Sequence, residues 1–330
     1  MQNSFISEFQ QKVLQMEASD FERLALEAFR FQAEHNPIYR EYLSGLGARP
    51  ERVQKLKEIP FLPIEFYKYH KVQCEGVQEQ QVFESSGTTG QAVSRHYVEN
   101  LSFYEQLSKQ IFERFYGPLS QYHLMALLPS YLERTSASLV YMVDRFMQHT
   151  SSESGFYLQD LTDLARKMEL FREKGEPVLL IGVTFALLDL AESGKYDFGN
   201  AIVMETGGMK GRRKEVLREE VHQKLCKQFG LRQIHSEYGM TEMMSQGYSK
   251  GKGIFDLPPS VQILLREVND PFAVYSERLR TGGINVIDLG NIETCCFLET
   301  KDLGRKLDAG FEVLGRFDNS DIRGCNLMVG

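Results

Sequence analysis

The chain has 330 residues, 38 of them basic and 45 acidic, so its formal net charge is −7, and 42% of its residues are hydrophobic. This is the composition of an ordinary globular protein, and at roughly 150 residues per domain the length suggests about two folding units. Basic residues are scattered except in the stretch 210–214, which is expected to be a solvated helix start rather than an anion site. The acidic balance therefore disfavours nucleic-acid binding.

The N-terminus and the apolar runs predict a cytoplasmic protein. The first eight residues lack both the basic segment and the apolar segment of a secretory signal. The longest apolar run, 178–188, contains Gly182 and Thr184 and is far shorter than the ~20 residues that span a bilayer, so no membrane span is expected. Cysteines occur without CxxC spacing at positions 74, 226, 295, 296 and 325, and we expect free thiols.

In chain order, the hydrophobic spacing first predicts helices over residues 1–48. The run from Ser19 to Glu22 has the pattern of a capping box. Apolar residues follow it at helical spacing, namely Phe21, Leu24, Ala25, Ala28 and Phe29. The pair Asn36 and Pro37 is expected to end this helix.

From about residue 120 short apolar runs alternate with amphipathic stretches. The runs 122–128, 178–183 and 201–204 predict strands, and 161–174 and 214–229 predict helices, so this part should form a parallel α/β sheet. After Gly247 the apolar runs lack helices between them, which predicts a smaller β-rich region. Its expected strands are 261–265, 284–289 and 294–298.

The strongest local motif follows the apolar pair Val82 and Phe83. It consists of Ser85, Ser86, Gly87, Thr88, Thr89 and Gly90. Glycines let backbone N–H groups approach an anion closely, and the hydroxyls add donors, so such a loop can bind phosphate. A turn without a ligand is the alternative, because clusters of glycine, serine and threonine are mostly turns. The segment lacks the GxxxxGK[ST] pattern of a Walker loop.

A second cluster occupies residues 235–242 and follows an expected strand at 231–234. Its candidate residues are Glu237, Tyr238, Gly239, Thr241 and Glu242. An aromatic ring can stack on a base, a hydroxyl can bind phosphate, and a carboxylate can hold Mg²⁺ beside phosphate oxygens. A capped turn with solvated glutamates is the alternative. A third segment, Gly207, Gly208 and Met209, also comes soon after an expected strand, where glycines permit close approach to a flat ligand.

In order and spacing these segments resemble the adenylate-forming (ANL) superfamily. Residues 85–90 are similar to its phosphate loop, 207–209 to its adenine-side turn, and 238–242 to its YGxTE motif. Asp302 resembles its ribose-binding aspartate, with lysine before it where glycine is common, and 315–318 resemble its GRxD hinge. The resemblance spans the chain from about residue 60 to the end.

The resemblance implies the large-domain fold of that superfamily: an α/β protein with N-terminal helices, parallel sheet layers and a smaller β-rich region. It divides the chain into a helical segment, 1–75, packed on an adenylate-forming core, 76–330. The chain stops soon after Asp318, so the mobile C-terminal lid domain of CoA ligases is expected to be absent. Residues 91–95 lack the Pro-Lys of many members, and Arg95 is expected to be the only permanently cationic substitute nearby.

Residues 62–68 and 236–242 look most like the LuxE-type acyl-protein synthetases of bacterial fatty-acid reductase systems. In that family a cysteine near the C-terminus accepts the acyl group, and Cys325 stands in the matching place. It follows Gly324 near a chain end, with Arg323 to favour the thiolate. The other four cysteines are expected to be small buried hydrophobes, with Cys295 and Cys296 on one strand and facing opposite sides.

The family implies ATP and Mg²⁺ as cofactors, a carboxylic acid, namely a fatty acid, as substrate, and a fatty-acid reductase as partner. By resemblance, residues 85–90 and Thr241 bind phosphates with Thr88 in a catalytic role, and Glu242 is both catalytic and the metal ligand. Cofactor-binding roles elsewhere fall to Gly207, Gly208, Met209, Glu237, Tyr238 and Gly239 on the adenine side, and to Asp302 and Arg316 at the ribose. The acyl-adenylate would then acylate Cys325.

Two alternatives to this function are left open. One is a CoA ligase of the phenylacetate type whose lid comes from another chain. The other is a nucleotide-binding scaffold that has lost catalysis and presents a docking surface to a reductase.

Overall fold

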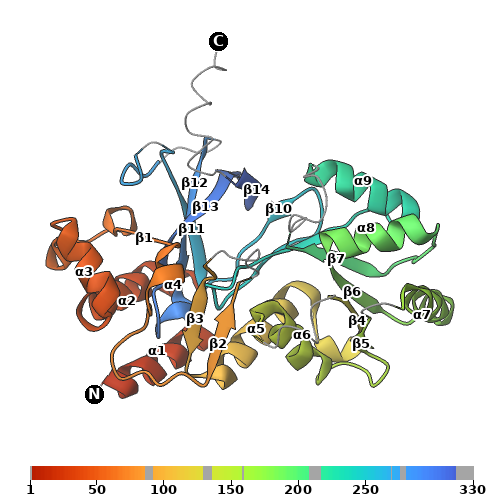
Figure 1. Cartoon of the computed structure of the whole chain (residues 1–330), viewed down its shortest axis with the longest axis horizontal. Helices are drawn as coiled ribbons and strands as arrows, with labels where there is room; N and C mark the ends of the chain where they lie inside the picture. Colours follow the sequence, from red (N-terminus) through yellow and green to blue (C-terminus); the bar gives the residue numbers. More distant parts are fainter. Residues whose placement is uncertain are drawn as a thin grey trace, which may run out of the picture. The chain divides into compact units, whose positions relative to one another are not determined.

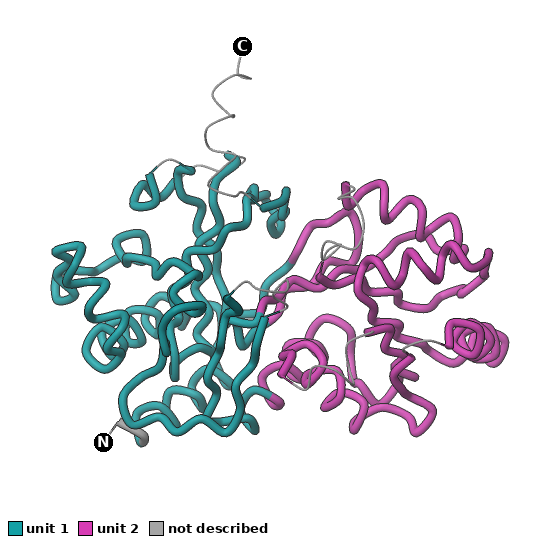
Figure 2. Tube along the Cα trace, viewed as in Figure 1, with its two compact units in different colours: residues 1–104, 241–245, 256–330 teal, residues 105–240, 246–255 magenta. Residues whose placement is uncertain are grey.

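The structure is a computed structural model, and it describes residues 2–85, 92–128, 136–157, 160–207, 217–268, 270–275 and 280–316. The Cα trace divides into two compact units (Figure 2). Unit 1 comprises Met1–Tyr104, Thr241–Ser245 and Asp256–Gly330, and unit 2 comprises Glu105–Met240 and Gln246–Phe255. The short segment Thr241–Ser245 thus belongs to unit 1, although the residues on either side of it belong to unit 2.

Unit 1 begins with helices, as the spacing predicts. They are α1 (Gln2–Gln15), α2 (Phe21–His35), α3 (Pro37–Gly45) and the short α4 (Phe66–Tyr69). All five apolar residues expected on the inner face of α2 are buried. Asn36 ends α2 and caps α3 by accepting a hydrogen bond from the Tyr39 backbone N–H, so the boundary at Pro37 is confirmed.

The expected capping box at Ser19 is wrong. Residues Ala18–Asp20 form a 3₁₀ turn, and the reciprocal cap joins Glu17 and Asp20 instead. Asp20 then precedes α2 without a side-chain cap of its own. The tighter turn comes before the helix and moves the capping pair toward the N-terminus.

The β-rich part of unit 1 is confirmed. Its antiparallel strands run in the order β14-β13-β12-β11, and β1 pairs in parallel with β13. Their bounds are β1 (Leu62–Pro63), β11 (Val261–Arg266), β12 (Thr281–Asp288), β13 (Phe297–Lys306) and β14 (Phe311–Arg316). A separate hairpin joins β2 (Gln81–Glu84) to β3 (Arg95–Val98).

The placement of Cys295 and Cys296 on a strand is wrong. The backbone turns after the 3₁₀ segment Leu289–Asn291, where the Thr294 N–H donates to the Asn291 carbonyl, and β13 starts only at Phe297. Both cysteines therefore lie in the turn, and both are fully buried.

Unit 2 contains the expected parallel sheet (Figure 1). The strand order is β5-β4-β6-β7-β8-β9, with β9 alone antiparallel to its neighbour. The strands are β4 (His123–Leu127), β5 (Gly155–Phe156), β6 (Val178–Val183), β7 (Ile202–Thr206), β8 (His235–Tyr238) and β9 (Gly247–Ser249), followed by the short β10 (Ile254–Phe255). Every residue of β6 is buried, as expected for a central strand covered on both faces.

The helices of this part are α5 (Leu101–Tyr116), which starts in unit 1, α6 (Ser138–Met147), α7 (Leu161–Lys174), α8 (Thr184–Ser193) and α9 (Arg218–Phe229). The predicted bounds of α7 are confirmed. The expected helix at 214–229 is shorter in the described residues, because Leu217 is its N-cap and α9 starts at Arg218. No helix in the described part of the chain is long and apolar enough to cross a membrane.

The expected strand at 231–234 is wrong, because those residues follow the helix end. Gly230 adopts a left-handed conformation that terminates α9, and the Leu231 N–H donates to the Cys226 carbonyl. The strand begins at His235, so the first half of the 235–242 motif is the strand itself.

Candidate functional site

The described candidate residues fall in both units. Ser85, Thr241, Glu242, Asp302 and Arg316 belong to unit 1, and Gly207, Glu237, Tyr238 and Gly239 belong to unit 2. The remaining candidates lie outside the described residues, namely Ser86, Gly87, Thr88, Thr89, Gly90, Gly208, Met209 and Cys325.

In unit 2 the sheet brings two of the motifs to one edge. Strands β7 and β8 are parallel neighbours, with Glu205 opposite Ser236. Gly207 follows β7 with a φ of 73°, a left-handed conformation that glycine adopts without the usual steric cost. Tyr238 ends β8, and its ring lies 5.8 Å from that of Phe255. The carboxyl ends of parallel strands are the common place for ligand crevices.

Glu237 connects these two strand ends. Its carboxyl group accepts a hydrogen bond of 2.5 Å from the Thr206 hydroxyl. Burial raises the pKa of Glu237 to about 7, against the opposing effect of the Thr206 hydrogen bond, and the charge of Glu205 raises it further. A Cβ atom at Gly239 would overlap this carboxyl group, so a larger residue there would force the Glu237 side chain to move.

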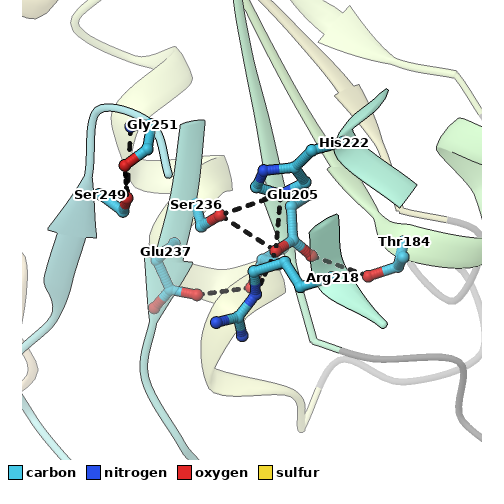
Figure 3. A network of polar contacts seen from close by, with 9 residues as sticks. Thr184, Glu205, Arg218, His222, Ser236, Glu237, Ser249 and Gly251 are labelled. Carbon is cyan, nitrogen blue, oxygen red and sulfur yellow. Dashed lines mark hydrogen bonds and ion pairs between the residues drawn. The ribbon is translucent and has the colours of Figure 1, made fainter. Parts of the chain in front are cut away.

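Sequence reasoning missed Glu205, which is the centre of a buried polar network (Figure 3). Its carboxylate accepts hydrogen bonds from Thr184 at 2.8 Å and Ser236 at 3.0 Å, and pairs with Arg218 at 3.2 Å. His222 lies 3.4 Å from the same carboxylate. Burial alone would raise the pKa of Glu205, but His222 and Arg218 outweigh it and lower the pKa. The one signal in the sequence was a charged residue directly after the apolar run 201–204.

In unit 1 the hairpin β2–β3 carries the segment expected to bind phosphate. Its base is closed by two bonds, from the Ser85 N–H to the Ser94 carbonyl at 3.0 Å and from the Ser94 N–H to the Ser85 hydroxyl at 2.9 Å. Arg95 pairs with Glu84 across the hairpin at 3.0 Å. The expected cation of this loop is therefore already engaged by a carboxylate.

Glu242 is the candidate metal ligand, and its side chain is only 6% exposed. Burial raises the pKa of its carboxyl group, while a hydrogen bond from Ser94 and the charges of Arg316 and Lys68 oppose that rise. Lys68 and Arg316 are thus the cations that act on this carboxylate. Among the described residues, no cluster of three or more His, Cys, Asp or Glu side chains could hold a metal ion. One carboxylate fits Mg²⁺ that is otherwise bound by substrate phosphates and water.

Asp302 and Arg316, the residues expected at the ribose, lie together in the structure. They face each other on β13 and β14, and the Arg316 Nε atom lies 3.1 Å from the Asp302 carboxylate. Asp302 is buried, and Arg316 is exposed. The pair offers a carboxylate and a guanidinium at one strand position, which suits the hydroxyl groups of a ribose.

The described cysteines fit a structural role. Cys74, Cys295 and Cys296 are buried, and Cys226 is half-buried on α9. Burial raises the pKa of each thiol, that of Cys295 to about 12. None of these four is expected to form a thiolate near neutral pH.

No protein-family model matches the chain, and no curated protein matches it in a sequence comparison. Solved structures do match. A 2-hydroxyisobutyryl-CoA ligase solved with 2-HIB-AMP and CoA in the thioesterification state gives a TM-score of 0.67 at 13% identity, over 94% of this chain and 71% of the ligase chain. The open conformation of that ligase gives 0.64 at 13% identity, over 94% of this chain and 78% of the other. The chain has the fold of an adenylate-forming enzyme.

A third structure supports the same fold. O-succinylbenzoate CoA synthetase of Bacillus subtilis, in complex with ATP and magnesium ion, gives a TM-score of 0.51 at 17% identity. The match covers 71% of this chain and 49% of the synthetase. The fold expected from the motif order, with a parallel α/β sheet and a β-rich part, is thus confirmed.

Proposed function

We propose that the protein activates a carboxylic acid with ATP to an acyl-adenylate and then transfers the acyl group to the thiol of Cys325. The observation that carries the proposal is the coincidence of fold and motifs. The structural match to a ligase that was solved with an acyl-adenylate covers 94% of this chain. The motifs of the chain also occur in the order that is typical of the adenylate-forming superfamily. At 13% sequence identity the structural similarity shows the fold alone, so the argument for the chemistry comes from the motif residues.

We assign the phosphates to residues 85–90 and Thr241, with Thr88 as a donor to the developing charge. We assign the adenine side to Gly207, Gly208, Met209, Glu237, Tyr238 and Gly239, and the ribose to Asp302 and Arg316. The strand-end position of Gly207 and Tyr238 and the pairing of Asp302 with Arg316 support these assignments.

Glu242 would ligate Mg²⁺ together with phosphate oxygens. When bound, the ion would offset the negative charge of the phosphates. The B. subtilis synthetase of similar fold was solved with ATP and magnesium ion. Burial raises the pKa of Glu242, and the hydrogen bond from Ser94 and the charges of Arg316 and Lys68 oppose that rise by favouring the ionised carboxylate that this role needs.

The chemistry has two steps. A carboxylate oxygen of the acid attacks the α-phosphorus of ATP, the bond to the β-phosphate oxygen breaks, and pyrophosphate leaves. The thiolate of Cys325 then attacks the acyl carbon, the bond to the phosphate oxygen breaks, and AMP leaves. The product is a thioester on the protein, suited to a reductase that accepts acyl groups.

The LuxE-like segments 62–68 and 236–242 favour a fatty acid as substrate and a fatty-acid reductase as partner. The four described cysteines are poor acyl acceptors, because burial raises the pKa of each thiol. This favours Cys325 as the acceptor.

A second candidate is an acyl-CoA synthetase. It is favoured by the CoA bound to the ligase of similar fold. Acid-dependent release of AMP would then require CoA, whereas transfer to Cys325 would not. If acid-dependent exchange of pyrophosphate into ATP is absent for every acid tried, the protein is a scaffold and not an adenylating enzyme.

The direct test is mass spectrometry of the intact protein after incubation with ATP, Mg²⁺ and a panel of carboxylic acids. The proposal expects a mass increase of one acyl group without CoA, reversed by hydroxylamine. AMP release that depends on CoA, with no mass increase, supports the second candidate.

A further inference from the structure

The segment Thr241–Ser245 carries both Thr241 and Glu242, yet it contains no regular secondary structure. Strand β8 ends before it at Tyr238, and β9 starts after it at Gly247. Its backbone N–H and C=O groups therefore need partners other than a sheet ladder. In unit 1 those partners are the side chains of His96, Asp288 and Asn291, each no more than 1% exposed.

Asp288, at the end of β12, holds the second half of the segment. One of its carboxylate oxygens accepts from the Met244 and Ser245 N–H groups, both at 2.9 Å. The other accepts from the Ser245 hydroxyl at 2.7 Å and the Gly290 N–H at 3.0 Å. Four donors on one buried carboxylate are what an ionised acceptor needs to stay buried.

Asn291 and His96 hold the first half. The Asn291 amide donates to the Glu242 carbonyl at 2.7 Å, and its oxygen accepts from the Met244 N–H at 3.1 Å. The His96 Nδ1 atom lies 2.8 Å from the Thr241 carbonyl, which can only accept, so Nδ1 carries the proton. The Nε2 atom is then free to accept from the Thr294 hydroxyl at 3.1 Å.

We propose that His96, Asp288 and Asn291 form a clamp that fixes the backbone of Thr241–Ser245 and so holds the Glu242 carboxylate in place for the metal before ATP arrives. These are positioning residues, since they act through the segment and do not touch ATP. His96 lies on β3, the second strand of the hairpin whose loop is assigned to phosphate, so it ties that hairpin to the Glu242 segment. The inference rests on the proposed role of Glu242.

A prearranged ligand needs no reorganisation when the ion binds, which is why supporting hydrogen bonds matter at metal sites. Loosening the clamp should therefore raise the Mg²⁺ concentration needed for half-maximal activity more than it raises the KM for ATP. A purely structural role would instead lower stability without a selective change in Mg²⁺ dependence.

The test compares Asp288→Asn with Glu293→Gln. Glu293 is a matched control, because it is also a buried carboxyl group of unit 1 that accepts from backbone N–H groups, those of Glu99 at 2.8 Å and Asn100 at 3.2 Å. The hydrogen bonds that its carboxyl group accepts in the described structure come from Gln10, Glu99 and Asn100 rather than from Thr241–Ser245. Ser245→Ala is the milder variant, since it removes one hydroxyl donor to Asp288 and adds no atoms.

Acid-dependent pyrophosphate exchange is measured against free Mg²⁺, with folding checked by circular dichroism and thermal melting. Asp288→Asn should raise the Mg²⁺ concentration for half-maximal exchange about tenfold and Ser245→Ala about threefold, as for other outer-shell changes. The KM for ATP at saturating Mg²⁺ should stay within about twofold in both variants, and Glu293→Gln should leave the Mg²⁺ dependence unchanged. If Asp288→Asn does not fold, Ser245→Ala decides.

A normal Mg²⁺ dependence in the clamp variants, or an equal shift in Glu293→Gln, overturns the inference. Calorimetric titration of ATP at several Mg²⁺ concentrations separates this failure from that of the proposed function, because it needs no acid. If the wild type binds Mg-ATP but exchanges no pyrophosphate, the proposed adenylation is refuted. The Mg²⁺ dependence of ATP binding in the clamp variants then tests the clamp. Absence of Mg-ATP binding by the wild type overturns both.

Discussion

The Thr206 hydroxyl donates a hydrogen bond to the Glu237 carboxyl group and so joins the last residue of β7 to the third residue of β8. One bond thus couples the strand that precedes Gly207 with the strand that leads into Tyr238. The carboxyl group also occupies the space beside Gly239. Glu237 therefore contacts the residue before Gly207 through Thr206 and lies directly against Gly239.

The first prediction concerns the pH dependence of stability. The pKa of Glu237 is raised from 4.5 to about 7, so the folded protein holds a proton there that the unfolded chain has lost. The stabilisation is complete below pH 4.5 and is lost as the pH rises through 7, a change of about 3 kcal/mol at roughly 1.4 kcal/mol per pKa unit. Glu237→Gln resembles the protonated form and should lack this loss.

Urea unfolding of both proteins between pH 5 and pH 8 measures the difference. The stability of Glu237→Gln should rise relative to the wild type as the pH increases. Glu205→Gln is the matched control, because the pKa of Glu205 is lowered and its substitution should show no such relative gain. Parallel stability curves for the wild type and Glu237→Gln would contradict the assignment.

The second prediction concerns the phosphate loop, which lies outside the described residues. Gly87→Val should suppress acid-dependent pyrophosphate exchange, because a branched side chain blocks backbone approach to the phosphates. Thr88→Val removes a hydroxyl donor at nearly equal volume and should lower the exchange rate by about two orders of magnitude. A folded Gly87→Val protein with normal exchange would refute the loop assignment.

The fold was largely predictable from periodicity. Two elements have the bounds that their apolar patterns predict, the helix Leu161–Lys174 and the strand Val178–Val183. The helix buries one face and the strand buries both, so burial leaves a clear pattern in each sequence. The strand His235–Tyr238 was missed, since three of its four residues are polar. Ser236 and Glu237 are satisfied by Glu205 and Thr206 on the neighbouring strand, and no local pattern reports a partner about 30 positions away.

The candidate site was predictable only in part. The pairing of Asp302 with Arg316 follows from a hairpin between neighbouring strands, which local sequence can suggest. The bond between His96 and Thr241 joins residues 145 positions apart, and nothing in either segment indicates the other. Supporting residues of this kind are fixed by the tertiary arrangement of the strands, so they escape motif reading.

The third prediction concerns the metal ligand. Glu242→Gln keeps the size of the side chain but removes its negative charge, so the Mg²⁺ concentration for half-maximal exchange should rise at least about tenfold. The maximal rate should also fall. Glu299→Gln is a suitable control, because Glu299 is a partly buried acid of the same unit whose pKa is also raised by burial. An unchanged Mg²⁺ titration in Glu242→Gln would show that another group binds the ion.

The last prediction separates the two proposed half-reactions. Adenylation needs residues 85–90, 207–209, 238–242, Asp302 and Arg316, whereas thioester formation needs a thiolate. Cys325→Ser should therefore retain acid-dependent pyrophosphate exchange and lose the hydroxylamine-labile acyl label. Serine is a poor substitute, because an unactivated alcohol has a pKa far above the ~8.5 of a thiol.

Cys226→Ser is the matched control for this experiment. Cys226 is the described thiol that is only half-buried, so it is the strongest competitor for acylation, although burial raises its pKa. Its substitution should leave both exchange and label intact. If the Cys325→Ser protein still acquires one thioester-linked acyl group and Cys226→Ser does not, Cys226 is the acceptor. If both variants are labelled, the acyl group resides on another cysteine, and the role of Cys325 is refuted while adenylation stands.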